Sequence, residues 1–210
     1  MKHIILPEGK PLTYYLEQEE VAARTCAEPC FFTWVVPPTV ICGRNQVIEN
    51  EVNLDFCRRE GIDVVRRKSG GGCVYADEGN IMTSYIEPAT DTAPVTFSHY
   101  LSLVVRALAT LGINAQATDR NDILIQGRKV SGNAFYYTQG AAGRHSIVHG
   151  TLLHSTNLER MVNAITPPQW KLDAKGVQSV RQRVVNISEL RDISLPDLRQ
   201  HIIQTLTFND

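Results

Sequence analysis

The sequence predicts one α/β domain with a mixed β-sheet. Apolar stretches of strand length alternate along the 210 residues with stretches whose apolar residues repeat at helical spacing. No internal repeat, low-complexity linker or sharp change of composition divides the chain, so residues 1–210 are expected to form a single domain. With 43% hydrophobic residues, a chain of this length can bury roughly 70% of its unfolded surface without a structural metal or a disulfide.

Helix and strand signals justify each expected element. Helices are expected at residues 13–26, 54–60, 97–111, 158–164 and 194–206. Gly61 and Gly112 end the second and third, and Ser194 with Pro196 begins the last. In the first helix, Leu12, Leu16, Glu19 and Ala23 show only a partial amphipathic rhythm. Strands are expected at residues 31–36, 39–42, 62–65, 73–75, 81–87, 122–125, 130–137 and 146–153.

Composition and charge exclude several classes of function. The formal net charge of -1 does not indicate attraction to nucleic acid or to a membrane surface. Pro7 and Glu8 interrupt the first apolar residues, so no signal peptide is expected, and no apolar run reaches membrane-spanning length. The five scattered cysteines are typical of reduced thiols. We therefore expect a soluble cytoplasmic protein that binds neither nucleic acid nor membrane.

Cations and glycines cluster between two of the expected strands. Residues 66–75 read Arg-Arg-Lys-Ser-Gly-Gly-Gly-Cys-Val-Tyr. Glycine lets the backbone turn and lets its N–H groups approach an anion, while Arg66, Arg67 or Lys68 supplies positive charge. By itself, the stretch fits an ordinary Gly-rich hairpin with solvated charges equally well. It is not a Walker A loop, which requires Lys-Ser or Lys-Thr after its last glycine, where this chain has Cys73 and Val74.

Lys129 opens a second unusual stretch. Alternation along a strand would place Lys129, Ser131 and Asn133 on one face, although a solvated edge strand is the alternative. Asp122, shortly before it, is a candidate Mg²⁺ ligand if nucleotide phosphates lie close. His149 would form a polar wall, because the glycine after it lets a ligand or a neighbouring chain pass close.

A basic segment, residues 171–185, reads as a loop. Its weak periodicity and Gly176 argue against a helix, and a loop of this length in a compact domain is more often functional than not. Its cations are Lys171, Lys175, Arg181 and Arg183. Together with the Gly-rich stretch and Lys129, this loop indicates a phosphate-binding site.

Taken in order, these stretches resemble the lipoate–protein ligase A family, which shares its catalytic fold with biotin–protein ligases and octanoyltransferases. The residues that carry the resemblance are Gly43-Arg44-Asn45-Gln46, Arg66-Arg67, Ser69-Gly70-Gly71-Gly72, Asp77 with Gly79-Asn80, Arg120-Asn121-Asp122, Arg128-Lys129-Val130-Ser131-Gly132, His149-Gly150-Thr151-Leu152-Leu153, Ala174-Lys175-Gly176 and Ser179-Val180-Arg181. The resemblance implies an α+β catalytic domain whose mixed, mainly antiparallel sheet is flanked by helices.

The resemblance also implies a two-step reaction. Lipoate and MgATP first give lipoyl-AMP and pyrophosphate, and a lysine of a lipoyl domain then attacks the mixed anhydride. The implied acceptors are the lipoyl domains of 2-oxoacid dehydrogenase E2 subunits and the glycine cleavage H protein. ATP and Mg²⁺ are thus the expected cofactors, with lipoate as the substrate in an apolar tunnel.

The same resemblance assigns roles to residues. Lys129 would be the catalytic residue, bridging the lipoyl carbonyl and the α-phosphate, and Asp122 the metal ligand. Residues 171–185 would cover the adenylate. The expected ATP or adenylate contacts are Arg67, Gly72, Cys73, Val74, Tyr75, Lys129, Lys175 and Gly176. The expected lipoate contacts are Arg67, Ser69, Gly70, Gly71, Lys129 and His149.

Two departures from the family keep alternatives open. The family commonly has alanine at the position of Cys73, so a transferase that moves octanoyl or lipoyl groups through a cysteine thioester, without ATP, stays open. A small buried thiol is the simpler interpretation. Larger members continue into a small C-terminal domain that these 210 residues lack, so a separate accessory chain could be required for adenylation. The third alternative is a module that binds lipoate or its adenylate without turnover.

Overall fold

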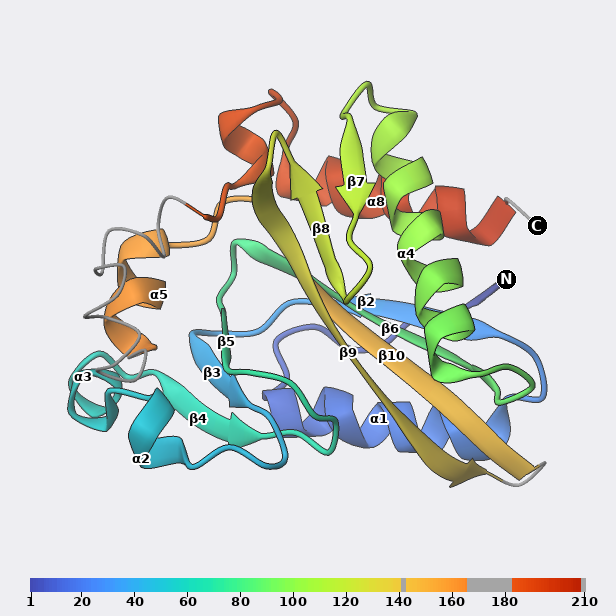
Figure 1. The fold of residues 1–210 in the computed structure, drawn as a ribbon, viewed down its shortest axis with the longest axis horizontal. Helices are drawn as coiled ribbons and strands as arrows, with labels where there is room; N and C mark the ends of the chain where they lie inside the picture. The colour runs from blue at the N-terminus through green and yellow to red at the C-terminus, as the bar shows by residue number, and fades with distance from the viewer. Residues whose placement is uncertain (141–142, 166–182, 209–210) are drawn as a thin grey trace.

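The computed structural model describes residues 1–140, 143–165 and 183–208 and contains two β-sheets (Figure 1). In the larger sheet, all neighbouring strands are antiparallel except the first pair, β1 and β2. Its order is β1 (Lys2–His3), β2 (Cys30–Trp34), β6 (Asn80–Pro88), β10 (Gly143–Leu153), β9 (Arg128–Gly140), β8 (Asp122–Ile125) and β7 (Ala115–Ala117). The smaller sheet places β3 (Thr39–Cys42) between the parallel β4 (Asp63–Arg66) and the antiparallel β5 (Val74–Ala76). The predicted mixed, mainly antiparallel sheet is confirmed.

Helices flank both sheets. The long helices cover the larger sheet, with α1 (Leu12–Thr25) on one face and α4 (Ala93–Ala109) and α8 (Leu195–Phe208) on the other (Figure 1). The short helices α2 (Ile48–Glu51), α3 (Leu54–Arg59) and α5 (Leu158–Ala164) lie near the smaller sheet, and the 3-10 turn η1 (Ile187–Glu189) precedes α8. Among the described residues, no helix is both long and apolar enough to cross a membrane.

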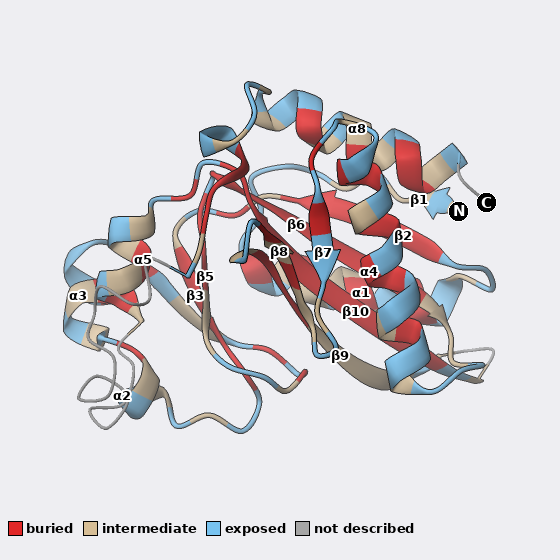
Figure 2. Cartoon of the chain, turned by 45° about the horizontal axis from the view of Figure 1, so that its top comes forward, coloured by how far each residue is buried: buried red, intermediate tan, exposed pale blue. Residues whose placement is uncertain are grey.

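The larger sheet is buried on both faces, which explains its nearly continuous apolar strands. Along β2, Phe31 packs into the core beneath α4 and α8, whereas Phe32 and Trp34 pack into the core beneath α1. All five residues of β2 are therefore buried, and the central strands form a continuous buried band (Figure 2). A third core joins the smaller sheet to α3 and α5 through residues such as Val40, Cys57 and Met161.

The elements that the sequence did not predict are short. The strands β1 and β7 and the helix α2 have two to four residues each, too few to show a period. Helix α4 begins at Ala93, four residues before the predicted start, because Pro94 is tolerated in a first helical turn. The strands β9 and β10 extend beyond their predicted ends to form a long hairpin.

Candidate active site

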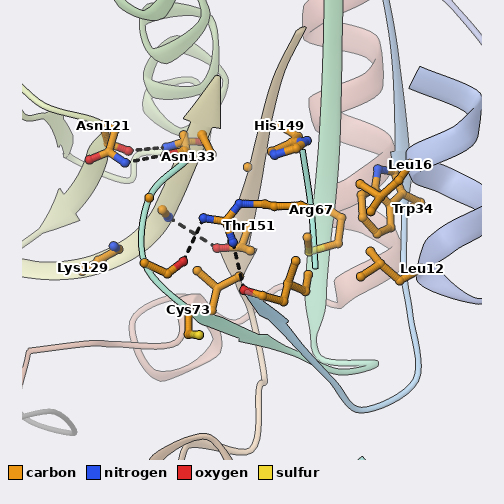
Figure 3. A pocket seen from close by; sticks show the side chains of 18 residues that line it. Leu12, Leu16, Trp34, Arg67, Cys73, Asn121, Lys129, Asn133, His149 and Thr151 are labelled. Carbon is orange, nitrogen blue, oxygen red and sulfur yellow. Dashed lines mark hydrogen bonds between the residues drawn. The ribbon is translucent and has the colours of Figure 1, made fainter. Parts of the chain in front are cut away.

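A pocket lies where the two sheets meet α1 (Figure 3). Its empty space is ≈ 590 Å³, part of which is open to solvent. Leu12, Leu16 and Trp34 gather at one side, Lys129 lies at the other, and Arg67 lies between them (Figure 3). The lining residues are Leu12, Leu16, Trp34, Ile41, Arg67, Gly71, Gly72, Cys73, Val74, Met82, Asn121, Lys129, Gly132, Asn133, Ala134, His149, Gly150 and Thr151. The pocket therefore has an apolar end and a polar end.

Arg67 organises the Gly-rich loop from within. Its guanidinium is buried and donates from Nη2 to the carbonyl oxygens of Gly70 and Gly72, at 2.7 and 2.8 Å. It also donates from Nε to Ser69 Oγ and from Nη1 to the carbonyl oxygen of Ile41, both at 2.9 Å. Burial lowers the pKa of Arg67, but an arginine starts so high that it stays protonated. Arg67 therefore shapes the loop and places a positive charge at its base.

Glycine is required at two points of this loop. Gly71 has φ +90°, a left-handed conformation that other residues rarely adopt. A Cβ on Gly43, in the turn after β3, would overlap the carbonyl oxygen of Gly71. Gly70 and Gly72, by contrast, have open space at the Cβ position. The loop thus closes tightly against β3 through Gly43 and Gly71.

Lys129 is held at the polar end of the pocket by an ion pair. Its Nζ lies 2.7 Å from Asp122 Oδ1, and both side chains are partly exposed. A Cβ on Gly132 would come within 2.9 Å of Lys129 Nζ and Cε, so the glycine leaves room for the lysine side chain. These contacts place one ammonium group opposite the Gly-rich loop.

The prediction that Lys129 shares a face with Ser131 and Asn133 is wrong. The pairing of β8 with β9 shifts by one residue, because Ile123 lies opposite Ser131 whereas Leu124 lies opposite Lys129. This β-bulge inverts the alternation after Lys129. Ser131 and Asn133 still share a face, since Asn133 Nδ2 donates to Ser131 Oγ at 3.1 Å. The bulge turns Lys129 toward Gly132 and the pocket.

Gly150, beside His149, leaves room for the side chain of Asn133. A Cβ on Gly150 would overlap Asn133 Oδ1, so this glycine accommodates a side chain of the neighbouring strand. Asn133 Nδ2 donates to the carbonyl oxygen of Asn121 at 2.8 Å. The bond ties the segment before Asp122 to β9.

His149 belongs to a buried chain of polar contacts behind the apolar end. Its Nε2 lies 2.7 Å from Ser69 Oγ, and its Nδ1 lies 2.9 Å from Glu19 Oε1. Ser84 Oγ donates to Glu19 Oε1 at 2.6 Å and accepts from Trp34 Nε1 at 3.0 Å. Because a carboxylate only accepts, His149 carries its Nδ1 proton toward Glu19. The chain fixes the orientation of two lining side chains, His149 and Trp34.

Sequence reasoning missed Glu19 as a site residue. It lies in α1 at four-residue spacing from Tyr15 and Ala23, both buried, and it is itself fully buried. A carboxylate on the inward face of a helix was the available signal, because such a group requires buried partners.

Of the other predicted site residues, some line the pocket and others do not. Cys73 and Val74 line the pocket, whereas Tyr75 is buried in the core of the smaller sheet. Tyr75 is therefore not among the residues that line the pocket. Ser69 and Gly70 lie behind the lining residues, next to Arg67.

Of the basic segment, residues 171–185, only the last three residues are described. Lys175 and Gly176 lie outside the described residues. Arg183 is described, and its carbonyl oxygen accepts from Lys129 N at 2.6 Å, while Val185 N donates to the carbonyl oxygen of Lys129 at 3.0 Å. The end of residues 171–185 is thus paired with the backbone of Lys129.

Cys73 does not have the features of an activated nucleophile. Its Sγ lies 3.3 Å from Cys42 Sγ, to which it donates its proton. This hydrogen bond, together with burial, raises the pKa of Cys73. A thiol with a raised pKa is a poor acyl acceptor at neutral pH.

Comparison with known proteins identifies the family of this chain. The model of the lipoyl protein ligase A/B catalytic domain matches residues 12–207. Lipoate-protein ligase LplJ of Bacillus subtilis is 38% identical over 173 residues, which are 81% of this chain and 51% of the relative. Lipoate–protein ligase 1 of Staphylococcus aureus is 36% identical over 192 residues, 90% of this chain and 57% of the relative. The chain thus spans about half the length of these relatives.

A solved structure shows the same fold. It belongs to a bipartite lipoate protein ligase from Thermoplasma acidophilum, described together with its E2 lipoyl domain. The TM-score is 0.85 at 26% identity, and the match covers 98% of this chain and 82% of that one. The family match extends over nearly the whole chain and agrees with the resemblance found in the motifs. The chain belongs to the lipoyl protein ligase A/B catalytic-domain family.

Proposed function

We propose that this chain is an ATP-dependent lipoate–protein ligase. The observation that carries the proposal is the pocket's two ends. The apolar end, with Leu12, Leu16 and Trp34, suits the dithiolane chain of lipoate, and the polar end sets Lys129 opposite the Gly-rich loop. The ligase names of the relatives support the same activity.

In the first step, a carboxylate oxygen of lipoate attacks the α-phosphorus of ATP, and the bond to the leaving pyrophosphate breaks. Two anions must approach each other, so positive charge at the point of contact lowers the barrier. Lys129 supplies a compact charge there, and Arg67 supplies another beneath the loop. The N–H groups near Gly72 are candidates for the phosphate contacts.

Asp122 fits the expected Mg²⁺ ion. Magnesium is commonly bound by one or two carboxylates together with substrate phosphates, and Asp122 provides a partly exposed carboxylate at the polar end. The ion would reduce the charge repulsion of the phosphates. Binding of ATP would then require Lys129 to exchange its Asp122 partner for a phosphate or carbonyl oxygen.

In the second step, the amine of an acceptor lysine attacks the lipoyl carbonyl and AMP leaves. Lys129 lies where it can stabilise the developing oxyanion. The proposed acceptors are lipoyl domains of 2-oxoacid dehydrogenase E2 subunits and the glycine cleavage H protein, in the cytoplasm. The bipartite ligase of T. acidophilum motivates including a separate accessory chain in the reaction.

The decisive experiment combines the chain with MgATP, lipoate and an apo lipoyl domain. We expect release of pyrophosphate and a lipoylated domain by mass, with no product from biotin, and octanoate tested in parallel measures the acyl preference. Lys129→Ala should reduce both half-reactions by roughly 10²-fold or more, while the exposed Lys10→Ala retains them.

Three outcomes would contradict the ligase. Absence of product, even with a candidate accessory chain, excludes it. ATP-independent transfer from octanoyl acyl carrier protein that Cys73→Ala abolishes would indicate the transferase. Lipoate binding without any pyrophosphate release would indicate a binding module.

A further inference from the structure

Two cysteines face each other across the smaller sheet at the edge of the pocket. Ile41 lies opposite Val74 in the antiparallel pair β3 and β5, so the next pair in register is Cys42 opposite Cys73. Their sulfur atoms are 3.3 Å apart. Directly opposed residues of antiparallel strands have Cα atoms about 4.5 to 5.5 Å apart, within the range that a disulfide spans. A bond between the two sulfurs is therefore within reach of these two strands.

The two sulfurs differ in pKa and in access, and the raised pKa of Cys73 makes its oxidation slow at neutral pH. The hydrogen bond from Cys73 lowers the pKa of Cys42 against the opposing effect of burial, and the nearby charges of Arg66 and Arg67 lower it further. Cys42 is fully buried, whereas Cys73 borders the pocket and is partly exposed. Cys73 is thus the sulfur that a small solute can reach, with Cys42 Sγ 3.3 Å away as the second sulfur of a disulfide.

We propose that Cys42 and Cys73 are a peroxide-sensitive dithiol, and that their oxidation to a cross-strand disulfide suppresses adenylate formation. Cys73 Sγ attacks an oxygen of hydrogen peroxide, the O–O bond breaks, the thiol proton goes to the departing hydroxide, and a sulfenic acid and one water form. Cys42 Sγ then attacks the sulfenic sulfur, and the departing hydroxide takes the Cys42 proton and leaves as a second water. From the neutral dithiol, one peroxide is consumed and two waters form. Cytosolic disulfides of this kind are transient and regulatory.

The bond would distort the Gly-rich loop. The sulfur separation falls from 3.3 Å to about 2.05 Å, so the segment that begins at Cys73 is drawn toward β3. Gly72, the preceding residue, accepts a hydrogen bond from Arg67 Nη2 at 2.8 Å and lines the pocket. A misplacement of about 1 Å in a positioning element can cost on the order of 100-fold in rate. The effect on activity rests on the proposed ligase function, whereas disulfide formation does not.

The first measurement counts thiols and maps the bond. The reduced, desalted chain is treated with hydrogen peroxide, and free thiols are titrated in denaturant. We expect two of the five thiols to disappear and to return with dithiothreitol. Chymotryptic cleavage after Trp34 separates Cys42 from Cys26 and Cys30, which trypsin leaves in one peptide because no Lys or Arg lies between Arg24 and Arg44. The linked peptides should contain Cys42 and Cys73.

The second measurement follows ATP-dependent pyrophosphate release before and after oxidation. We expect the rate of pyrophosphate release to fall 10-fold to 100-fold after oxidation. Treatment with dithiothreitol, which is removed before the assay, should restore the rate. Cys42→Ala should be resistant to peroxide, and the matched variants Cys26→Ala and Cys57→Ala should stay sensitive. Because Cys42→Ala could perturb the core, the thiol count in the unmodified chain stands as an independent measurement.

Each outcome decides the proposal. Absence of a bond between Cys42 and Cys73 overturns it, as does a mapped bond with unchanged pyrophosphate release. If the reduced chain releases no pyrophosphate at all, the ligase function fails, and with it the regulatory effect. The peptide map then still shows whether the dithiol itself oxidises.

Discussion

Glu19 places a carboxylate, with no exposed surface, behind the apolar end of the pocket. Ser84, Tyr136 and His149 all direct polar groups at its two oxygens. Burial and the charges of Glu19 and Glu20 raise the pKa of Tyr136, so its hydroxyl remains a donor at physiological pH. Every hydrogen-bond partner of Glu19 named here is therefore a donor. A side chain at position 19 that itself donates a hydrogen bond would face one of these donors.

We predict that Glu19→Gln destabilises the protein and weakens lipoate binding. The amide nitrogen would meet a donor where the carboxylate accepted one, at a cost of about 2 to 4 kcal/mol in the free energy of unfolding. Trp34 and His149 would lose their fixed orientation, so KM for lipoate should rise more than kcat falls. Urea unfolding and steady-state kinetics test this. Glu17→Gln, exposed on the same helix, should change neither, and equal effects of both variants would refute the argument.

A second residue-scale prediction concerns Gly132→Ala. The added methyl group would come within 2.9 Å of Lys129 Nζ and Cε, at the end of a flexible side chain that can move away. The fold should therefore lose less than about 1 kcal/mol, whereas pyrophosphate release should fall roughly 10-fold to 100-fold because Lys129 is displaced. Thermal unfolding and single-turnover assays separate the two effects. Unchanged turnover would show that the position of Lys129 in this structure is not the working one.

At the scale of elements, the Gly-rich loop depends on one guanidinium. Arg67 makes four hydrogen bonds that tie the loop to β3 and to itself. Lysine keeps the charge but has neither the planar fork nor the number of donors. We predict that Arg67→Lys leaves buried carbonyl groups unpaired, destabilises the domain by about 1 to 3 kcal/mol and reduces adenylation by more than 10-fold.

The matched control for Arg67→Lys is Arg58→Lys. Arg58 pairs with Asp55 at 3.0 Å on an exposed helix surface, where both side chains are largely solvated, so it should have little effect. If charge alone mattered at Arg67, its lysine variant would retain both stability and activity. Chemical unfolding and pyrophosphate release distinguish these cases.

The elements also show where sequence reasoning reached its limit. Long periodic segments such as α1 and β10 were predicted within a few residues, because burial imposes their pattern. The β-bulge at Lys129 was not, since an extra residue in one strand leaves no mark on alternation until the partner's register is known. The burial of Tyr75 and the ion pair of Asp122 with Lys129 likewise depend on which strands pair and in which register.

At the scale of the molecule, motifs predicted the family and several residues that line the pocket, but neither its apolar end nor how the pocket is assembled. Its walls come from positions as distant as Leu12, Val74 and Thr151, which meet when the two sheets pack around α1. Cys42 received no role from the sequence, because its proximity to Cys73 arises from the pairing of β3 with β5. Long-range contacts of this kind require the fold.

Because the pocket joins both sheets and α1, its ligand should stabilise the whole domain. A ligand present at 100 times its Kd adds about 2.7 kcal/mol to the free energy of unfolding. For a chain of 210 residues this corresponds to a rise in Tm of roughly 5 to 10 °C. We predict such a rise with a non-hydrolysable lipoyl adenylate, which would contact the apolar end, Lys129 and the Gly-rich loop together. Differential scanning calorimetry measures it.

Fragments of the adenylate and a variant of Lys129 show whether the rise in Tm comes from this pocket. Lipoate or AMP alone should raise Tm less than the adenylate, because each would occupy one end of the pocket. Lys129→Ala should lose most of the adenylate effect while its own Tm stays near that of the unmodified chain, since its side chain is partly exposed. An equal rise in Tm for both proteins would mean that the adenylate binds elsewhere, and the two-ended pocket would then not be the active site.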